Sequence, residues 1–173
     1  MADREGERET MEREKIRRWL VPAVMILSVV LMGWYLCQLQ GQERVSDAKL
    51  EDVTAAVTKT LDTKAMQESD SQMIKRLYGL NPADYAGIAL YYPATNMDAE
   101  ELLIVQLKDV SQQETVKAAI ESRLETQKNS FEGYGMEQFA LLEKSVVDVE
   151  GNYILFVVNE QAAKAQSAFL QAL

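Results

Sequence analysis

The fold is decided by a stretch near the C-terminus, Val146-Val147-Asp148-Val149-Glu150-Gly151-Asn152-Tyr153-Ile154-Leu155-Phe156-Val157-Val158. Its two runs are rich in β-branched and aromatic residues, which favour strands. Between the runs, Gly151 and Asn152 are residue types that tolerate the positive φ angles of tight turns. The stretch therefore predicts a β-hairpin, and residues 161–172 after it predict a helix with one apolar side.

A second hairpin-plus-helix unit is predicted upstream. Strand-like runs at residues 87–92 and 102–108 are joined by a loop of residues 93–100. Ser111-Gln-Gln-Glu114 matches a capping box, which opens a helix reaching about residue 128. The buried stripe of this helix is expected to contain Val116, Ala119, Ile120 and Leu124.

These units predict the fold class and the domain organisation. Residues 47–65 carry apolar side chains at steps of three and four, which indicates an amphipathic helix. Ser69 or Asp70 caps a second helix, which ends at Gly79. We expect an α+β chain in which residues 41–67 form a helical stalk. Residues 68–173 then form the domain, an antiparallel sheet of two ββα units with helices on one face.

The N-terminal part predicts a membrane anchor, because no charged residue occurs from Trp19 to Gln42. A bilayer core about 30 Å thick needs about 20 apolar residues of helix, so residues 19–40 predict a single span in contact with the lipid bilayer. Four Lys or Arg residues precede the span within residues 13–18, whereas Arg44 alone follows closely. The excess of positive charge predicts a cytoplasmic tail of residues 1–18 and an extracellular C-terminal domain.

Two other processing routes are less consistent with this segment. The apolar run is longer than the roughly 7–15 residues of a signal-peptide core, and no Ala-x-Ala-like site follows it directly. Cys37 invites comparison with a lipoprotein, but Leu36 precedes it where a lipobox has Gly or Ala. The sequence favours an uncleaved anchor and leaves cleavage open.

Composition excludes several classes of activity. The formal net charge is −9, and it arises beyond residue 18 because the tail is neutral, so nucleic acid and anionic surfaces are poor partners. The chain has no histidine, which excludes Ser-His-Asp and Cys-His catalysis and the usual zinc sites. Its single cysteine, Cys37, rules out an intramolecular disulfide. We predict no catalytic residue, no cofactor and no metal ion.

The segment most like a functional motif is a glycine-containing loop between two predicted helices. Its glycines could bring backbone N–H groups close to a ligand, with an adjacent carboxylate as acid or base. Alternatively, the glycines permit the turn while the aromatic side chains fasten it to the core. The candidate ligand or interaction residues are Phe131, Glu132, Gly133, Tyr134, Gly135 and Glu137.

Two further clusters have a functional and a structural interpretation. Asp98, Glu100 and Glu101 crowd the first inter-strand loop and could attract a cation, although such loops are more often simply solvated. Tyr91-Tyr92-Pro93 at a strand end is either an aromatic contact patch for a partner or an edge of the core.

Several segments resemble one protein family: Leu77-Tyr-Gly-Leu80, Glu101-Leu-Leu-Ile-Val105, Gln127-Lys-Asn-Ser-Phe-Glu-Gly-Tyr-Gly135 and Gly151-Asn-Tyr-Ile-Leu-Phe-Val-Val158. They are similar to Gram-positive, largely clostridial envelope proteins grouped as domain of unknown function 4358, over about residues 73–173. Members of this family are typically tethered by a lipobox cysteine or by one N-terminal span, and this chain looks like the second kind. The resemblance implies no activity, cofactor or catalytic residue.

Two classes of function follow. The first is a membrane-anchored, extracytoplasmic accessory module of the cell envelope that docks on an envelope protein, with a ring-forming scaffold of a sporulation or secretion assembly as a variant. The second is a carboxylate-dependent enzyme acting on glycans, which requires two converging carboxylates, and Glu132 with Glu137 is the pair the sequence offers. A homo-oligomer is compatible with either class.

Overall fold

The computed structural model describes Met25, Ser28, Met32 and residues 45–173. The chain separates into two units, Met1–Gln42 and Glu43–Leu173, and the account below concerns the second. Apart from those three residues, the predicted span of residues 19–40 lies outside the described part, as do the tail of residues 1–18 and Cys37. Within the described part, no helix has both the length and the apolar character needed to cross a membrane.

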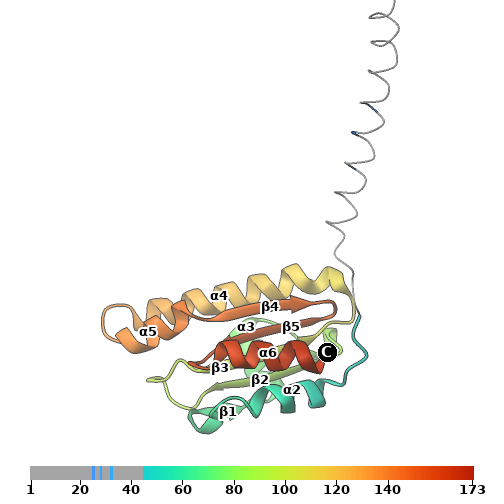
Figure 1. The fold of residues 1–173 in the computed structure, drawn as a ribbon. Coiled ribbons are helices and arrows are strands. Elements are labelled where there is room, and N and C mark those ends of the chain that lie inside the picture. The colour runs from blue at the N-terminus through green and yellow to red at the C-terminus, as the bar shows by residue number, and fades with distance from the viewer. Residues whose placement is uncertain (1–24, 26–27, 29–31, 33–44) are drawn as a thin grey trace, which may run out of the picture. The chain divides into compact units, whose positions relative to one another are not determined.

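The described domain contains helices and strands in a mixed order (Figure 1). In chain order the elements are α2 (Leu50–Thr58), η1 (Thr63–Ala65), β1 (Met66–Glu68), α3 (Ser71–Tyr78), η2 (Pro82–Asp84), β2 (Gly87–Pro93), β3 (Glu101–Gln106), η3 (Val110–Gln112), α4 (Gln113–Phe131), α5 (Met136–Glu143), β4 (Val146–Glu150), β5 (Tyr153–Val158) and α6 (Ala162–Ala172). The strands form one antiparallel sheet in the order β1-β2-β3-β5-β4. The predicted α+β class and both predicted hairpins are confirmed, and the short edge strand β1 was not predicted.

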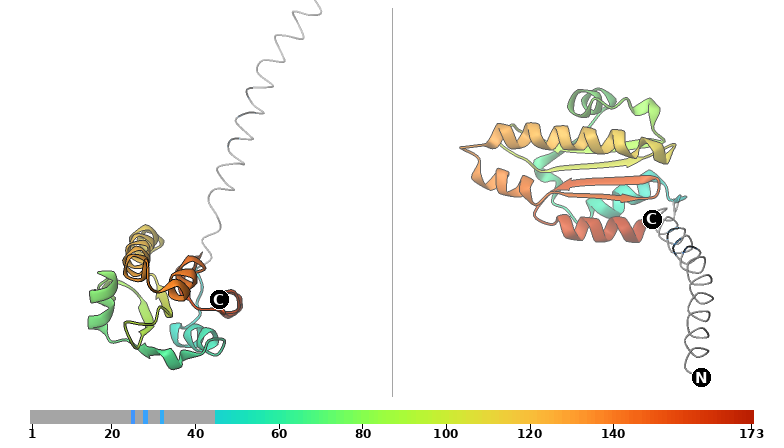
Figure 2. Two further views of the ribbon diagram at one scale, coloured as in Figure 1. Left: turned by 90° about the vertical axis from the view of Figure 1, so that its left-hand side faces the viewer. Right: turned by 90° about the horizontal axis from the view of Figure 1, so that it is seen from above.

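Helices cover both faces of the sheet, so the prediction of helices on one face is wrong (Figure 2). One face packs against α3, α4 and α5 and forms what we call the first core; the other packs against α2 and α6 and forms the second core. The reason lies in the central strands β3 and β5. Residues 102–105 and 153–158 are continuously apolar and buried, and a strand with two buried faces reads as such a run rather than as an alternation.

The alternation of side chains along the central strands assigns each residue to a core. The first core takes Leu103, Val105, Ile154, Phe156 and Val158 from these strands. The second core takes Leu102, Ile104, Tyr153, Leu155 and Val157. The register of the strand pair, in which Leu103 faces Phe156 and Leu102 faces Val157, keeps the two sets apart.

The expected stalk is instead part of the folded domain. Helix α2 places Val53 and Val57, both fully buried, in the second core together with Phe169 of α6. The amphipathic pattern of residues 47–65 was recognised correctly, but such a pattern does not identify what the apolar side packs against.

The start of the described domain is fastened to its C-terminal half. The Ser46 backbone N–H donates to Asn152 Oδ1 at 2.8 Å, and Asn152 Nδ2 donates back to the Ser46 carbonyl at 3.2 Å. The Ser46 hydroxyl also donates to the carbonyl of Leu173 at 3.0 Å. In the hairpin turn, Gly151 adopts a positive φ of 56°, whereas Asn152 does not.

The predicted ends of α3 are confirmed, whereas the predicted start of α4 is wrong. Asp70 accepts hydrogen bonds from the N–H groups of residues 72 and 73, and Gly79 ends α3 with a φ of 68°, as predicted. The capping box before α4 is formed by Asp109 and Gln112 rather than by Ser111 and Glu114. A short 3-10 turn, η3, precedes the α-helix, so the chain turns into the helix two residues earlier than expected.

The packing of α2 makes a prediction about stability. Val57→Asp places a charge in the second core without a partner, so it should lower the free energy of unfolding of the full-length chain by at least about 3 kcal/mol. Ala55→Asp, on the exposed side of the same helix, should cost less than about 1 kcal/mol. Urea denaturation followed by circular dichroism measures both. Equal, small effects of the two substitutions would show that residues 47–65 are a stalk after all.

Candidate functional site

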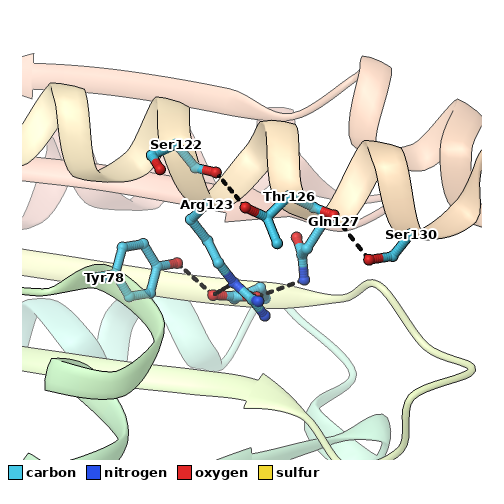
Figure 3. Close-up of polar contacts among 7 residues, drawn as sticks. Tyr78, Ser122, Arg123, Thr126, Gln127 and Ser130 are labelled. Carbon is cyan, nitrogen blue, oxygen red and sulfur yellow. Dashed lines mark hydrogen bonds and ion pairs between the residues drawn. The ribbon is translucent and has the colours of Figure 1, made fainter.

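A carboxylate lies fully buried in the first core at the start of β3. This residue, Glu101, has a side-chain exposure of 0 % and belongs by alternation to the same face as Leu103. Three side chains from two helices converge on its carboxylate (Figure 3). They are Tyr78, the last residue of α3, and Arg123 and Gln127, one turn apart on α4.

The carboxylate of Glu101 is saturated with donors. The Tyr78 hydroxyl donates to Oε1. Arg123 donates from Nη2 to Oε2 at 2.8 Å and from Nε to both oxygens at 3.2 Å. The Gln127 amide donates to Oε2 at 2.8 Å. A buried carboxylate needs such a set, because removing a charge from water costs several kcal/mol that only a partner and hydrogen bonds offset.

The neighbouring groups respond to the same carboxylate. Burial, and then the negative charge of Glu101, raise the pKa of Tyr78 well above its ordinary value, so its hydroxyl stays a donor at physiological pH. Burial opposes the charge on Arg123, but the hydrogen bonds and charge of Glu101 outweigh it and raise the pKa of the guanidinium. Tyr78 and Arg123 therefore hold α3 and α4 to β3 through one carboxylate.

A cavity of about 510 Å³ adjoins this network. Arg123 and Gln127 line it from α4, and Arg76 lines it from the exposed side of α3. The loop after β2 contributes residues 94–96 and Asp98, and the end of α4 contributes Phe131. Tyr134 of the predicted glycine-containing loop completes the wall.

In the predicted glycine-containing loop, some residues pack in the core and others line this cavity. Phe131 is buried, and its ring lies 6.1 Å from that of Tyr134, which is 66 % exposed at the cavity. Gly133 has a φ of 86°, which disfavours other residues, and a Cβ at Gly135 would lie 2.5 Å from the Phe131 ring. The two glycines thus have a structural explanation.

The two carboxylates nominated for catalysis differ in their surroundings. Glu132 is exposed at the end of α4 and lies outside the linings of the cavities described here. Glu137 of α5 lines a second cavity, of about 840 Å³, together with Asp98, Glu100 and Glu160. Among residues 45–173, no group of three or more acidic side chains is placed to hold a metal ion.

The three carboxylates predicted to share the acidic inter-strand loop have different surroundings in the structure. Asp98 accepts a hydrogen bond from the Thr95 hydroxyl at 2.7 Å, and Glu100 accepts one from the buried amide of Asn159 at 2.9 Å. Glu101 turns inward to Arg123. The sequence interpretation of three carboxylates sharing one solvated loop is therefore wrong for Glu101.

Sequence reasoning also missed the partners of Glu101. Arg123 and Gln127 follow Val116 and Ile120 at helical spacing and precede buried Phe131, so they occupy the buried stripe of α4. A cation and an amide at stripe positions, with a glutamate opening an apolar strand, were the available signals. Tyr92 lines the cavity and packs on the first core, whereas Tyr91 packs on the second.

Because Glu101 and Arg123 form a buried ion pair, the effects of substituting them on the free energy of unfolding should not be additive. Glu101→Leu leaves Arg123 buried without a counter-charge and should lower the free energy of unfolding by about 3–5 kcal/mol. Adding Arg123→Met should restore part of this loss, because it removes the unpaired charge, while the Tyr78 hydroxyl and the Gln127 amide still lack their acceptor. Urea denaturation of the full-length variants measures both, with Glu125→Gln on the exposed side of α4 as control. A double variant no more stable than Glu101→Leu would contradict the assignment.

Glu100 predicts a pH dependence of stability. Burial, followed by the charges of Asp62, Asp98 and Glu160, raises the pKa of Glu100. A raised pKa in the folded state favours the protonated form, so this contribution to stability is present at low pH and is lost as the pH rises through the folded pKa. Glu100→Gln should therefore stabilise the protein at pH 7 by no more than about 1 kcal/mol, and the gain should vanish below about pH 4.

Unfolding of Glu100→Gln and of the control Glu125→Gln at both pH values measures this effect. The amide introduced by Glu100→Gln retains an acceptor oxygen for Asn159, so loss of that hydrogen bond does not complicate the comparison. The explanation would be contradicted if Glu100→Gln lowered the stability at pH 7, or if its stabilising effect were larger at low pH. Either result would show that the Glu100 carboxylate is not repelled by its acidic neighbours.

Comparison with known proteins gives one match. The family described as a domain of unknown function, DUF4358, matches residues 59–159, from the end of α2 to the residue after β5. No curated protein and no solved structure matches the chain. The match spans more than half of the chain and includes Glu101, Arg123 and Gln127, so the chain belongs to the DUF4358 family.

Proposed function

We propose that this chain is a membrane-anchored, extracytoplasmic interaction module of a bacterial cell envelope, with no catalysis of its own. The observation that carries the proposal is the use of the Glu101 carboxylate. Glu101 is fully buried and accepts hydrogen bonds from Tyr78, Arg123 and Gln127, so its carboxylate is engaged within the fold. Such a network fastens helices to a sheet, and the carboxylate at its centre faces its donors rather than a substrate.

The location of the module is supported by the N-terminal sequence. Residues 19–42 contain no charged side chain, and the basic residues before this stretch favour a cytoplasmic N-terminus. The partner we expect is another protein of the envelope.

The position of Glu132 and Glu137 favours a module over a carboxylate-dependent enzyme. Glycosidases place two carboxyl groups about 5–10 Å apart across a bound sugar. Glu137 lines the second cavity, whereas Glu132 lines neither that cavity nor the one beside Arg123. A ring-forming scaffold would be a module that pairs with copies of itself.

The proposal predicts the orientation of the chain. In a Cys37→Ser background, Ser167→Cys on the exposed side of α6 should react with a membrane-impermeant maleimide on intact cells. Thr10→Cys in the predicted tail should react only after lysis. Labelling of Thr10→Cys on intact cells, or failure of the maleimide to label Ser167→Cys there, would contradict the proposed topology.

The same proposal predicts a partner. Affinity purification of the full-length tagged chain from its native membrane in mild detergent should recover an envelope protein in stoichiometric amount, identified by mass spectrometry. Recovery of the chain with itself alone would favour the scaffold variant. Recovery of the chain as a monomer without a partner would contradict the module.

A further inference from the structure

The guanidinium of Arg123 has donors that the described protein does not use. An arginine carries five N–H groups. Glu101 receives hydrogen bonds from Nε and Nη2, and Nη1 has no acceptor among residues 45–173. The side chain is 14 % exposed and lines the 510 Å³ cavity. Because the pairing with Glu101 fixes the plane of the guanidinium, its outer edge is a preorganised donor for a second acceptor.

The charges around the cavity indicate a singly charged ligand. Arg76 adds a second cation to the lining, and the structure records no ion pair for it within the described residues. Asp98 is the carboxylate in the lining, and Glu101 lies behind Arg123. In the lining itself, Arg76 and Arg123 outnumber Asp98 by one charge, which a single carboxylate balances, whereas a doubly charged phosphate exceeds it and is repelled by Asp98 and by Glu101 behind Arg123.

The rest of the lining suits a polar ring. Tyr134 and Tyr92 present aromatic side chains, each with a flat apolar ring and a polar hydroxyl. The amides of Gln67 and Asn96 line the same cavity, and neither is engaged in a hydrogen bond within residues 45–173. The volume lies within the range of about 300–1,000 Å³ typical of small-ligand pockets.

An extended peptide is a poorer fit. Peptides that add a strand to a sheet need an edge along which several backbone groups are free. The sheet edge that borders the cavity is β1, which has three residues.

We propose that this cavity binds a sugar carrying a single carboxylate. Arg123 and Arg76 receive the carboxylate, Tyr134 and Tyr92 contact the ring, and the amides of the lining bind its hydroxyl groups. The inference adds a ligand to the proposed interaction module. It rests on the proposed function in one respect only, that the sugar would come from the cell envelope.

Isothermal titration of the full-length protein with glucuronic acid tests the proposal. Wild-type protein should bind glucuronic acid at least about tenfold more tightly than glucose, because glucose lacks the carboxylate. Arg76→Gln and Tyr134→Ala should each weaken binding about fivefold or more, and both positions are exposed, so folding is expected to persist. Lys117→Gln, which removes a partly exposed cation of α4 outside the lining, should bind like wild type.

Arg123→Lys tests the guanidinium itself. It keeps the charge beside Glu101 but loses the planar fork, so it should weaken glucuronic acid binding about tenfold or more. Its unfolding curve shows whether the domain has remained folded. If it has not, Arg76→Gln and Tyr134→Ala decide the question.

Four results would overturn the proposal. They are the absence of glucuronic acid binding at millimolar concentration, equal binding of glucose, tighter binding of inorganic phosphate, or tighter binding of N-acetyl-alanyl-alanine through its free carboxylate. These titrations use purified protein, so they succeed or fail independently of membrane topology. Thiol labelling on cells tests the module, and titration tests the cavity.

Discussion

The buried carboxylate of Glu101 is the constraint on which the arrangement of α3, α4 and β3 depends. It opens the central strand β3 inside the first core, where a charge is costly unless donors surround it. The donors come from elements separated in sequence, Tyr78 of α3 and Arg123 and Gln127 of α4. Apolar packing alone tolerates sliding of a helix over a sheet, whereas three directional contacts to one carboxylate fix the position of both helices.

That constraint also shapes the surface. Arg123, which reaches inward to Glu101, also lines the cavity formed by α3, α4 and the loop after β2. Asp98 of this loop lines both this cavity and the larger one beside α5 and α6. The two cavities differ in charge: the first holds two arginines, and the second holds Glu100, Glu137 and Glu160 with one lysine.

Sequence patterns within a few residues correctly predicted those features of the fold that depend on neighbouring residues alone. The hairpin at Gly151 and the Gly79 helix end depend on turn chemistry within a few residues, so the sequence identifies them. The packing of α2 in the second core, and the covering of both sheet faces, depend on partners distant in sequence. Of the site, Phe131 and Tyr134 were nominated and line the cavity, but Glu101 was interpreted as a loop carboxylate. The signals for this pairing are a glutamate that opens an apolar strand and a cation and an amide in the buried stripe of α4, and neither stretch alone shows that these residues meet.

The most direct measurement is side-chain ¹⁵N NMR of the arginines in the full-length protein. The account predicts one guanidinium with slow rotation of its Nη groups, because Glu101 holds Nε and Nη2 of Arg123 together. Its signals should disappear in Arg123→Lys and should resemble those of freely rotating arginines in Glu101→Gln if that variant is folded. Fast rotation of every guanidinium in the wild-type protein would contradict the buried pair, and with it the organisation of the first core and its cavity.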